Sequence, residues 1–174
     1  MNRTLKHLAL MLLCGTAVSA MAAELPINGK FAVDKNGKPE IWRGRGTRPG
    51  VTCEAIAASN KTDHALYVET DKNSYYVDTR QFDLKGSKKM EFSIQGKGTG
   101  GFAALMLLYD RKGVYAGSKV LVQGSVPQND FKTFKGSLEL PSDLNGKNIH
   151  IGMLSLIVFA NSQIAFENAA LSAE

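Results

Sequence analysis

Apolar and polar residues alternate in short runs along most of the chain, and this period of two is typical of half-buried β-strands. In one run Met90, Phe92 and Ile94 fall on one face, with polar residues between them. Many short strands predict an all-β fold, an antiparallel β-sandwich of two packed sheets. The pattern predicts strands over residues 29–33, 39–43, 51–56, 64–70, 74–79, 89–95, 102–110, 117–123, 131–140, 149–159 and 163–171.

Turn-forming residues separate these runs. Residues 34–37, 110–113 and 143–146 each begin with Asp and end with Gly. Because Asp bonds the local backbone and Gly accepts a positive φ, we expect a tight turn at each stretch.

Two runs, residues 102–110 and 151–160, are apolar on both faces. Each is short and lies among strand-like neighbours, which favours a strand over a helix. We expect both to be central strands, covered on one side by the second sheet and on the other by loops or a ligand surface.

The beginning of the chain predicts export. Arg3 and Lys6 precede an apolar stretch that is too short for a membrane span and is followed by small residues, which is typical of a signal peptide over residues 1–22. Cleavage is expected after Ala22 or Ala23, leaving residues 23–174 as one domain in the periplasm or outside the cell. A lipid anchor on Cys14 is the alternative, but Leu13 stands where a small residue is required.

Net charge and cysteine content argue against a nucleic-acid partner and against thiol chemistry. Loss of Arg3 and Lys6 takes two positive charges from the formal net charge of +5, leaving +3. The remaining basic residues are scattered, whereas nucleic-acid binding usually requires a concentrated basic face. Cys53 is then the sole cysteine, so the domain has no internal disulfide, and a buried apolar role for its thiol is favoured over a catalytic one.

Residues 96–101 match G-x-G-x-x-G directly after a predicted strand. A dinucleotide site also needs a following helix and an acidic residue about 20 positions on. Neither is present, so we interpret this stretch as a flexible hairpin loop.

The best candidate for ligand contacts is the stretch 41–48. It holds Trp42, the sole tryptophan, beside Arg43 and Arg45, with Arg48 across a turn. A sugar ring stacks on an aromatic face, and guanidinium groups favour a carboxylate or sulfate. The alternatives are a core position for Trp42 and a solvated loop for the arginines.

Tyr109 and Tyr115 flank the turn at residues 110–114 and form a second candidate platform at a loop edge. Tyr75 and Tyr76 point to opposite faces of their strand, so at most one of them serves a site.

Catalysis has little support in the sequence. His64 and His150 stand in no metal-ligand or nucleophile spacing. A polysaccharide lyase or hydrolase that uses Arg45, His150 and Tyr109 is the enzyme alternative.

Four motifs carry a family resemblance: residues 28–31 (Asn-Gly-Lys-Phe), 76–79, 108–110 and 164–171. With them the chain resembles carbohydrate-binding jelly rolls of the galactose-binding-like fold. The resemblance implies a secreted, non-catalytic module that binds a polysaccharide or oligosaccharide on a sheet face or loop edge. It also implies a structural calcium near Glu167, where an aspartate is usual. The other possibility is a structural or protein-interaction domain of a secreted assembly.

Overall fold

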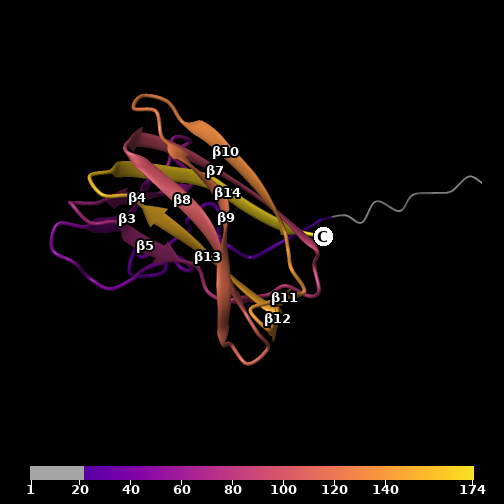
Figure 1. The fold of residues 1–174 in the computed structure, drawn as a ribbon. Coiled ribbons are helices and arrows are strands. Elements are labelled where there is room, and N and C mark those ends of the chain that lie inside the picture. Colours follow the sequence, from indigo (N-terminus) through magenta and orange to yellow (C-terminus); the bar gives the residue numbers. More distant parts are fainter. Residues whose placement is uncertain (1–21) are drawn as a thin grey trace, which may run out of the picture.

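A computed structural model describes residues 22–174, so the signal-peptide prediction lies outside the described residues. Two antiparallel sheets pack face to face (Figure 1). The first, which we call the β7 sheet, has the order β10-β7-β14-β4-β3, with β1 paired to β14. Its strands are β1 (Ala23–Glu24), β3 (Thr52–Ala57), β4 (His64–Glu69), β7 (Lys89–Thr99), β10 (Lys132–Glu139) and β14 (Gln163–Ala173).

The second sheet, the β8 sheet, has the order β2-β5-β13-β8-β9, with β6 paired to β13. A short hairpin of β11 and β12 stands at one end of the sandwich (Figure 1). The predicted all-β, two-sheet antiparallel sandwich is thereby confirmed. The remaining strands are β2 (Arg43–Gly44), β5 (Tyr75–Asp78), β6 (Phe82–Asp83), β8 (Gly101–Tyr109), β9 (Tyr115–Ser125), β11 (Asp143–Leu144), β12 (Lys147–Asn148) and β13 (Ile151–Val158).

Aromatic and branched side chains from both inner faces form one core. Phe102 of β8 packs edge-on against Phe134 of β10 and Phe166 of β14, with ring centroids 5.0 and 5.1 Å apart. Leu154 and Leu156 of β13 are fully buried beside them. Burial of this apolar surface is the main force that holds the two sheets together.

The two runs that are apolar on both faces are neighbours in the centre of the β8 sheet, as predicted. Met106 of β8 and Leu154 of β13 are register partners that point into the core. Leu105 and Ser155 are the next such pair and point to the opposite, outer side. The second apolar face of these strands therefore belongs to the outside of the sandwich.

Two predicted strands, at residues 29–33 and 39–43, are largely irregular. Only an isolated bridge between Val33 and Pro39 and the start of β2 form there. Asn28 and Phe31 adopt positive φ values of 49° and 50°, which breaks the extended backbone. The apolar residues of these runs reach the core from loops, and that is why their alternation resembled a strand.

The glycine-rich stretch 96–101 is mostly strand rather than flexible loop. β7 continues to Thr99 and the hairpin turns at Gly100, which has a φ of 96°. A Cβ on Gly98 would lie 1.9 Å from the carbonyl oxygen of Gln163 on β14. The glycines thus allow close backbone packing and form no phosphate-binding turn.

Candidate functional site

The outer side of the β8 sheet, which we call the β8 face, gathers aromatic, aliphatic and charged side chains. Directly opposed residues of antiparallel strands point to the same side of a sheet. Ser155 is opposed to Asp78 on β5 and to Leu105 on β8, so this row crosses the face. By the same register the face comprises Tyr76, Asp78, Leu105, Leu107, Tyr109, Tyr115, Val120, Met153, Ser155 and Ile157.

One side of the β8 face carries a fixed ion pair. Arg45 bonds Asp78 through two nitrogens: its Nε donates to Oδ2, and its Nη2 donates to Oδ1 at 3.2 Å. The same guanidinium lies 4.8 Å from the ring centroid of Tyr76. The bond to Asp78 raises the pKa of Arg45. A charged, planar group is thus held in one orientation on the face.

The other side of the β8 face carries a tyrosine pair. The rings of Tyr109 and Tyr115 meet edge to face with centroids 5.6 Å apart, and Tyr115 is 51% exposed. Burial raises the pKa of Tyr109, Asp78 raises it further, and Arg45 lowers it. The ion pair and the tyrosine pair therefore lie close enough to influence each other. These two tyrosines are brought together as the sequence predicts.

Aliphatic side chains form the floor of the β8 face. Leu105, Met153 and Ile157 are half-buried, and Val120 on the neighbouring strand is 53% exposed. Ser155 lies among them, fully buried, and its Oγ has no hydrogen-bond partner within residues 22–174. A buried hydroxyl without a hydrogen bond lowers the stability of the folded state, so the Ser155 hydroxyl is an unfavourable feature of this floor.

Trp42 does not belong to the β8 face, which corrects the predicted tryptophan platform. Its side chain is only 2% exposed, and its ring packs on Phe31 at 5.4 Å. Its Nε1 donates to the carbonyl oxygen of Asn28 at 3.2 Å. Because both ring faces are covered, Trp42 offers no surface to a sugar ring.

The three arginines of residues 43–48 do not converge. Arg45 bonds Asp78, while Nη1 of Arg48 donates to the carbonyl oxygen of Ser74 at 3.5 Å. Arg43 is exposed on β2 and lines a separate cleft of about 860 Å³ at the edge of the sandwich. The expected common site of the arginines is therefore divided between the β8 face and this edge cleft.

A groove of about 580 Å³ extends the β8 face beyond Tyr109. It is lined by the polar and charged residues Gln81, Asp83, Lys85, Arg111 and His150, together with Phe82, Gly86 and Ile151. Of the lyase candidates, Arg45 and Tyr109 share the face, and the backbone N–H of His150 donates to the carbonyl oxygen of Tyr109 at 3.0 Å.

Several residues of the site were missed by reasoning from the sequence. Tyr76, Asp78 and Ser155 belong to it because of strand register. The alternation of residues 74–79 already placed Tyr76 and Asp78 on one side, and that signal was available. The pairing of Asp78 with Arg45 joins positions 33 residues apart and has no local signal.

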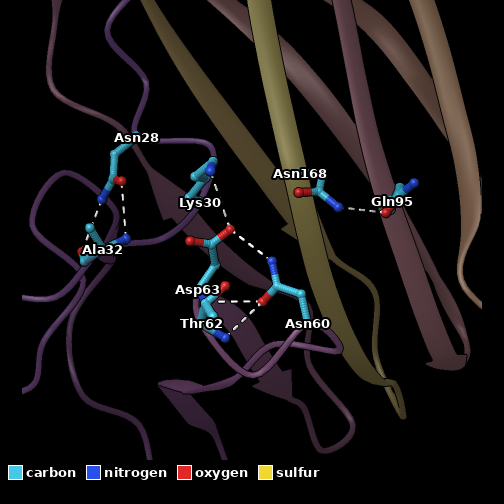
Figure 2. A network of polar contacts seen from close by, with 8 residues as sticks. All are labelled: Asn28, Lys30, Ala32, Asn60, Thr62, Asp63, Gln95 and Asn168. Carbon is cyan, nitrogen blue, oxygen red and sulfur yellow. Dashed lines mark hydrogen bonds and ion pairs between the residues drawn. The ribbon is translucent and has the colours of Figure 1, made fainter.

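The residues present do not fit a calcium ion at Glu167. This carboxylate is 3% exposed, and its two oxygens accept the backbone N–H and the hydroxyl of Ser59 at 2.7 and 2.6 Å. It is therefore a buried anchor and not a solvent-facing group. Nearby, Figure 2 shows the Asp63 carboxylate bound by the Asn60 amide at 2.9 Å and the Lys30 ammonium at 3.3 Å. Residues 22–174 contain no cluster of three His, Cys, Asp or Glu side chains that could hold a metal.

Comparisons with known proteins reveal likeness only at the level of structure. No protein-family model matches the chain, and no curated protein matches it. The CBM22-1 xylan-binding domain of Paenibacillus barcinonensis Xyn10C has a TM-score of 0.59 at 11% identity, covering 87% of this chain and 95% of its own. The family 11 carbohydrate-binding module of Clostridium thermocellum Lic26A-Cel5E has a TM-score of 0.56 at 15% identity, covering 87% and 95%. The chain has the jelly-roll β-sandwich fold of carbohydrate-binding modules.

An enzyme shares this fold as well. A cyclase from Fischerella sp. TAU has a TM-score of 0.61 at 16% identity and covers 88% of this chain and 98% of its own. The chain spans about a quarter of the longer proteins that it matches, 23% of a tailspike domain from bacteriophage CBA120 and 28% of a Clostridium thermocellum xylanase. No helix within residues 22–174 is long and apolar enough to cross a membrane.

Proposed function

We propose that the protein is an exported, non-catalytic carbohydrate-binding module that holds a glycan on the β8 face. The observation that carries the proposal is that the exposed Tyr115, the half-buried Tyr109 and a fixed Arg45–Asp78 pair share one outer face of a jelly roll. Carbohydrate-binding modules with this fold support the glycan class.

The chemistry of the face suits a sugar chain. Tyr109, Tyr115 and Tyr76 present ring surface to the C–H faces of pyranose rings. Arg45 and Asp78 offer donors and acceptors to hydroxyl groups. An extended glycan would cross the sheet from the ion pair toward the tyrosine pair.

Two features favour binding over lyase chemistry. A catalytic tyrosine base must lose its proton, but burial raises the pKa of Tyr109. An arginine that neutralises a substrate carboxylate must be available, but Arg45 is already paired with Asp78. The arrangement is that of a recognition surface.

Export is part of the proposal. Ala23 and Glu24 pair with Ala173 and Ser172 at the end of β14. Cleavage after Ala22 would leave this strand intact, and mass spectrometry of the exported protein tests the cleavage position.

The test is binding of the purified residues 23–174 to an array of neutral, uronic and sulfated polysaccharides, with and without calcium. The proposal expects selective retention that does not depend on calcium, because the Glu167 oxygens are bound by Ser59. It fails when no polysaccharide is retained, or when retention requires calcium and a chelator abolishes it.

A small apolar ligand is a second candidate. The aliphatic floor of Leu105, Met153 and Ile157 favours it, since such side chains stack poorly on sugars but pack well on hydrocarbon. A structurally similar cyclase was solved in complex with an indole compound. Titration of residues 23–174 with indole and with an oligosaccharide, each followed by isothermal titration calorimetry, separates the two candidates.

A further inference from the structure

The edge cleft that Arg43 lines is a second concave region, separate from the β8 face. It has a volume of about 860 Å³, which lies within the range of small-molecule sites. Its inner wall contains Trp42, Tyr75 and Cys53, while three cationic side chains, Lys38, Arg43 and Arg80, stand around it.

The aromatic wall of the edge cleft is held rigidly. The Tyr75 hydroxyl donates to the carbonyl oxygen of Gly46 at 2.6 Å, and the Trp42 indole donates to Asn28. Burial raises the pKa of Cys53 to about 11, so its thiol stays protonated at neutral pH and adds no negative charge. The wall therefore gives the cleft a fixed shape, and the indole N–H and the tyrosine hydroxyl are already bound.

The cations of the edge cleft are available to a ligand. Within residues 22–174 none of Lys38, Arg43 and Arg80 forms an ion pair with a carboxylate, in contrast to Arg45. The one side-chain bond among them is donated by Arg80 to the backbone carbonyl of Glu40 at 3.4 Å.

Two carboxylates also line the edge cleft, those of Asp34 and Glu40. Asp34 is already engaged, because its Oδ1 accepts the backbone N–H groups of Asn36 and Lys38 at 2.8 and 3.1 Å. These bonds lower the pKa of Asp34 and fix the turn that presents Lys38. Three cations thus face one unengaged carboxylate.

We propose that the edge cleft binds an oxyanion, a carboxylate or sulfate carried by a small organic ligand of monosaccharide size. Arg43 and Arg80 hold the anionic group by charge-assisted hydrogen bonds, and the partly exposed Pro39 and Ile41 contact the rest of the ligand. The site does not depend on glycan binding at the β8 face.

Trp42 provides the readout, because it is the sole tryptophan of the chain and lies in the wall of the cleft. Sodium glucuronate is titrated into residues 23–174 while the Trp42 emission is recorded. Glucose is the neutral control of the same ring size, and sodium sulfate tests the anionic group alone. We expect a saturable change with glucuronate, none with glucose, and weakening of the glucuronate affinity as salt is added.

Three variants decide the assignment. Arg43→Gln and Arg80→Gln should each weaken glucuronate binding roughly tenfold, since each removes a charged hydrogen-bond donor. Arg48→Gln removes the same charge from a nearby exposed position outside the cleft and should leave the affinity unchanged. A saturable change with sulfate assigns the site to the anionic group itself and supports the proposal. An equal response to glucose, no saturable response to glucuronate, or equal loss in Arg48→Gln would overturn it.

Discussion

The two outer faces of the sandwich are built from similar strands but carry opposite surfaces. On the β7 sheet the polar groups satisfy one another: the Tyr67 hydroxyl donates to Glu69 at 3.1 Å, and the Gln163 amide donates to the same carboxylate at 2.8 Å. On the β8 face the row that starts at Asp78 continues through the buried Ser155, whose hydroxyl lacks a partner within residues 22–174, to Leu105 and Val120. The β7 sheet thus pairs polar groups at this point, whereas the β8 face combines partly exposed aromatic rings with aliphatic surface, which is suited to a ligand.

The largest expected effect is a loss of stability from a substitution in the core, away from both outer faces. Trp42→Ala should destabilise the domain by about 3–5 kcal/mol, because it removes a buried aromatic side chain and its bond to Asn28. Urea unfolding followed by circular dichroism measures this loss. The variant should retain the polysaccharide affinity of the wild type in its folded fraction. A stable Trp42→Ala protein that has lost polysaccharide binding would show that Trp42 contacts the polysaccharide.

The second effect distinguishes the faces directly. Tyr109→Ala should weaken polysaccharide binding roughly fivefold to tenfold, since one aromatic contact contributes about 1 kcal/mol. Affinity electrophoresis with a retained polysaccharide measures the change. Tyr67→Ala is the matched control, because Tyr67 is a strand tyrosine on the outer side of the β7 sheet. Equal weakening in both variants would show that the two outer faces do not differ in polysaccharide binding.

The third effect concerns the ion pair. Arg45→Gln should weaken glycan binding by roughly threefold, because Asp78 loses the group that orients it, while stability changes by less than about 1 kcal/mol at this exposed pair. Isothermal titration calorimetry gives the affinity and thermal unfolding gives the stability. Stronger binding in this variant would mean that Arg45 blocks the face.

The smallest effect tests the unsatisfied hydroxyl. Ser155→Ala should be neutral or stabilise the domain by up to about 1 kcal/mol, since no hydrogen bond is lost. Ser162→Ala is the control, because Ser162 is equally buried and its Oγ accepts the backbone N–H of Gly101 at 3.3 Å. Chemical denaturation compares the two. Comparable destabilisation by both substitutions would mean that Ser155 has a partner in solution.

The contrast also explains what the sequence could predict. Alternation is a local signal, so the longer strands of both sheets and the apolar outer side of residues 102–110 were accessible to it. Tyr109 and Tyr115 were predicted together because one turn joins them. The sequence could not show whether Trp42 lies in the core or on the surface. It enters the core from an irregular segment, where alternation does not tell which way a side chain points.

Long-range pairing limited the rest. The Arg45–Asp78 contact depends on β2 lying beside β5, and the row through Ser155 depends on β13 lying between β5 and β8. These neighbours are far apart in the chain, so their register follows from the packed fold and not from residue spacing. The surroundings of Glu167 have the same origin, because Ser59 reaches this carboxylate from 108 residues away.

The central claim is that the β8 face binds the glycan, and a residue-resolved titration tests it most directly. Backbone amide shifts of residues 23–174 are recorded by NMR while an oligosaccharide from the best-retained polysaccharide is added. The account predicts that perturbed amides lie in β5, β8, β9 and β13, while those of β4, β7 and β14 stay in place. Perturbations concentrated on β4, β7 and β14 would contradict it.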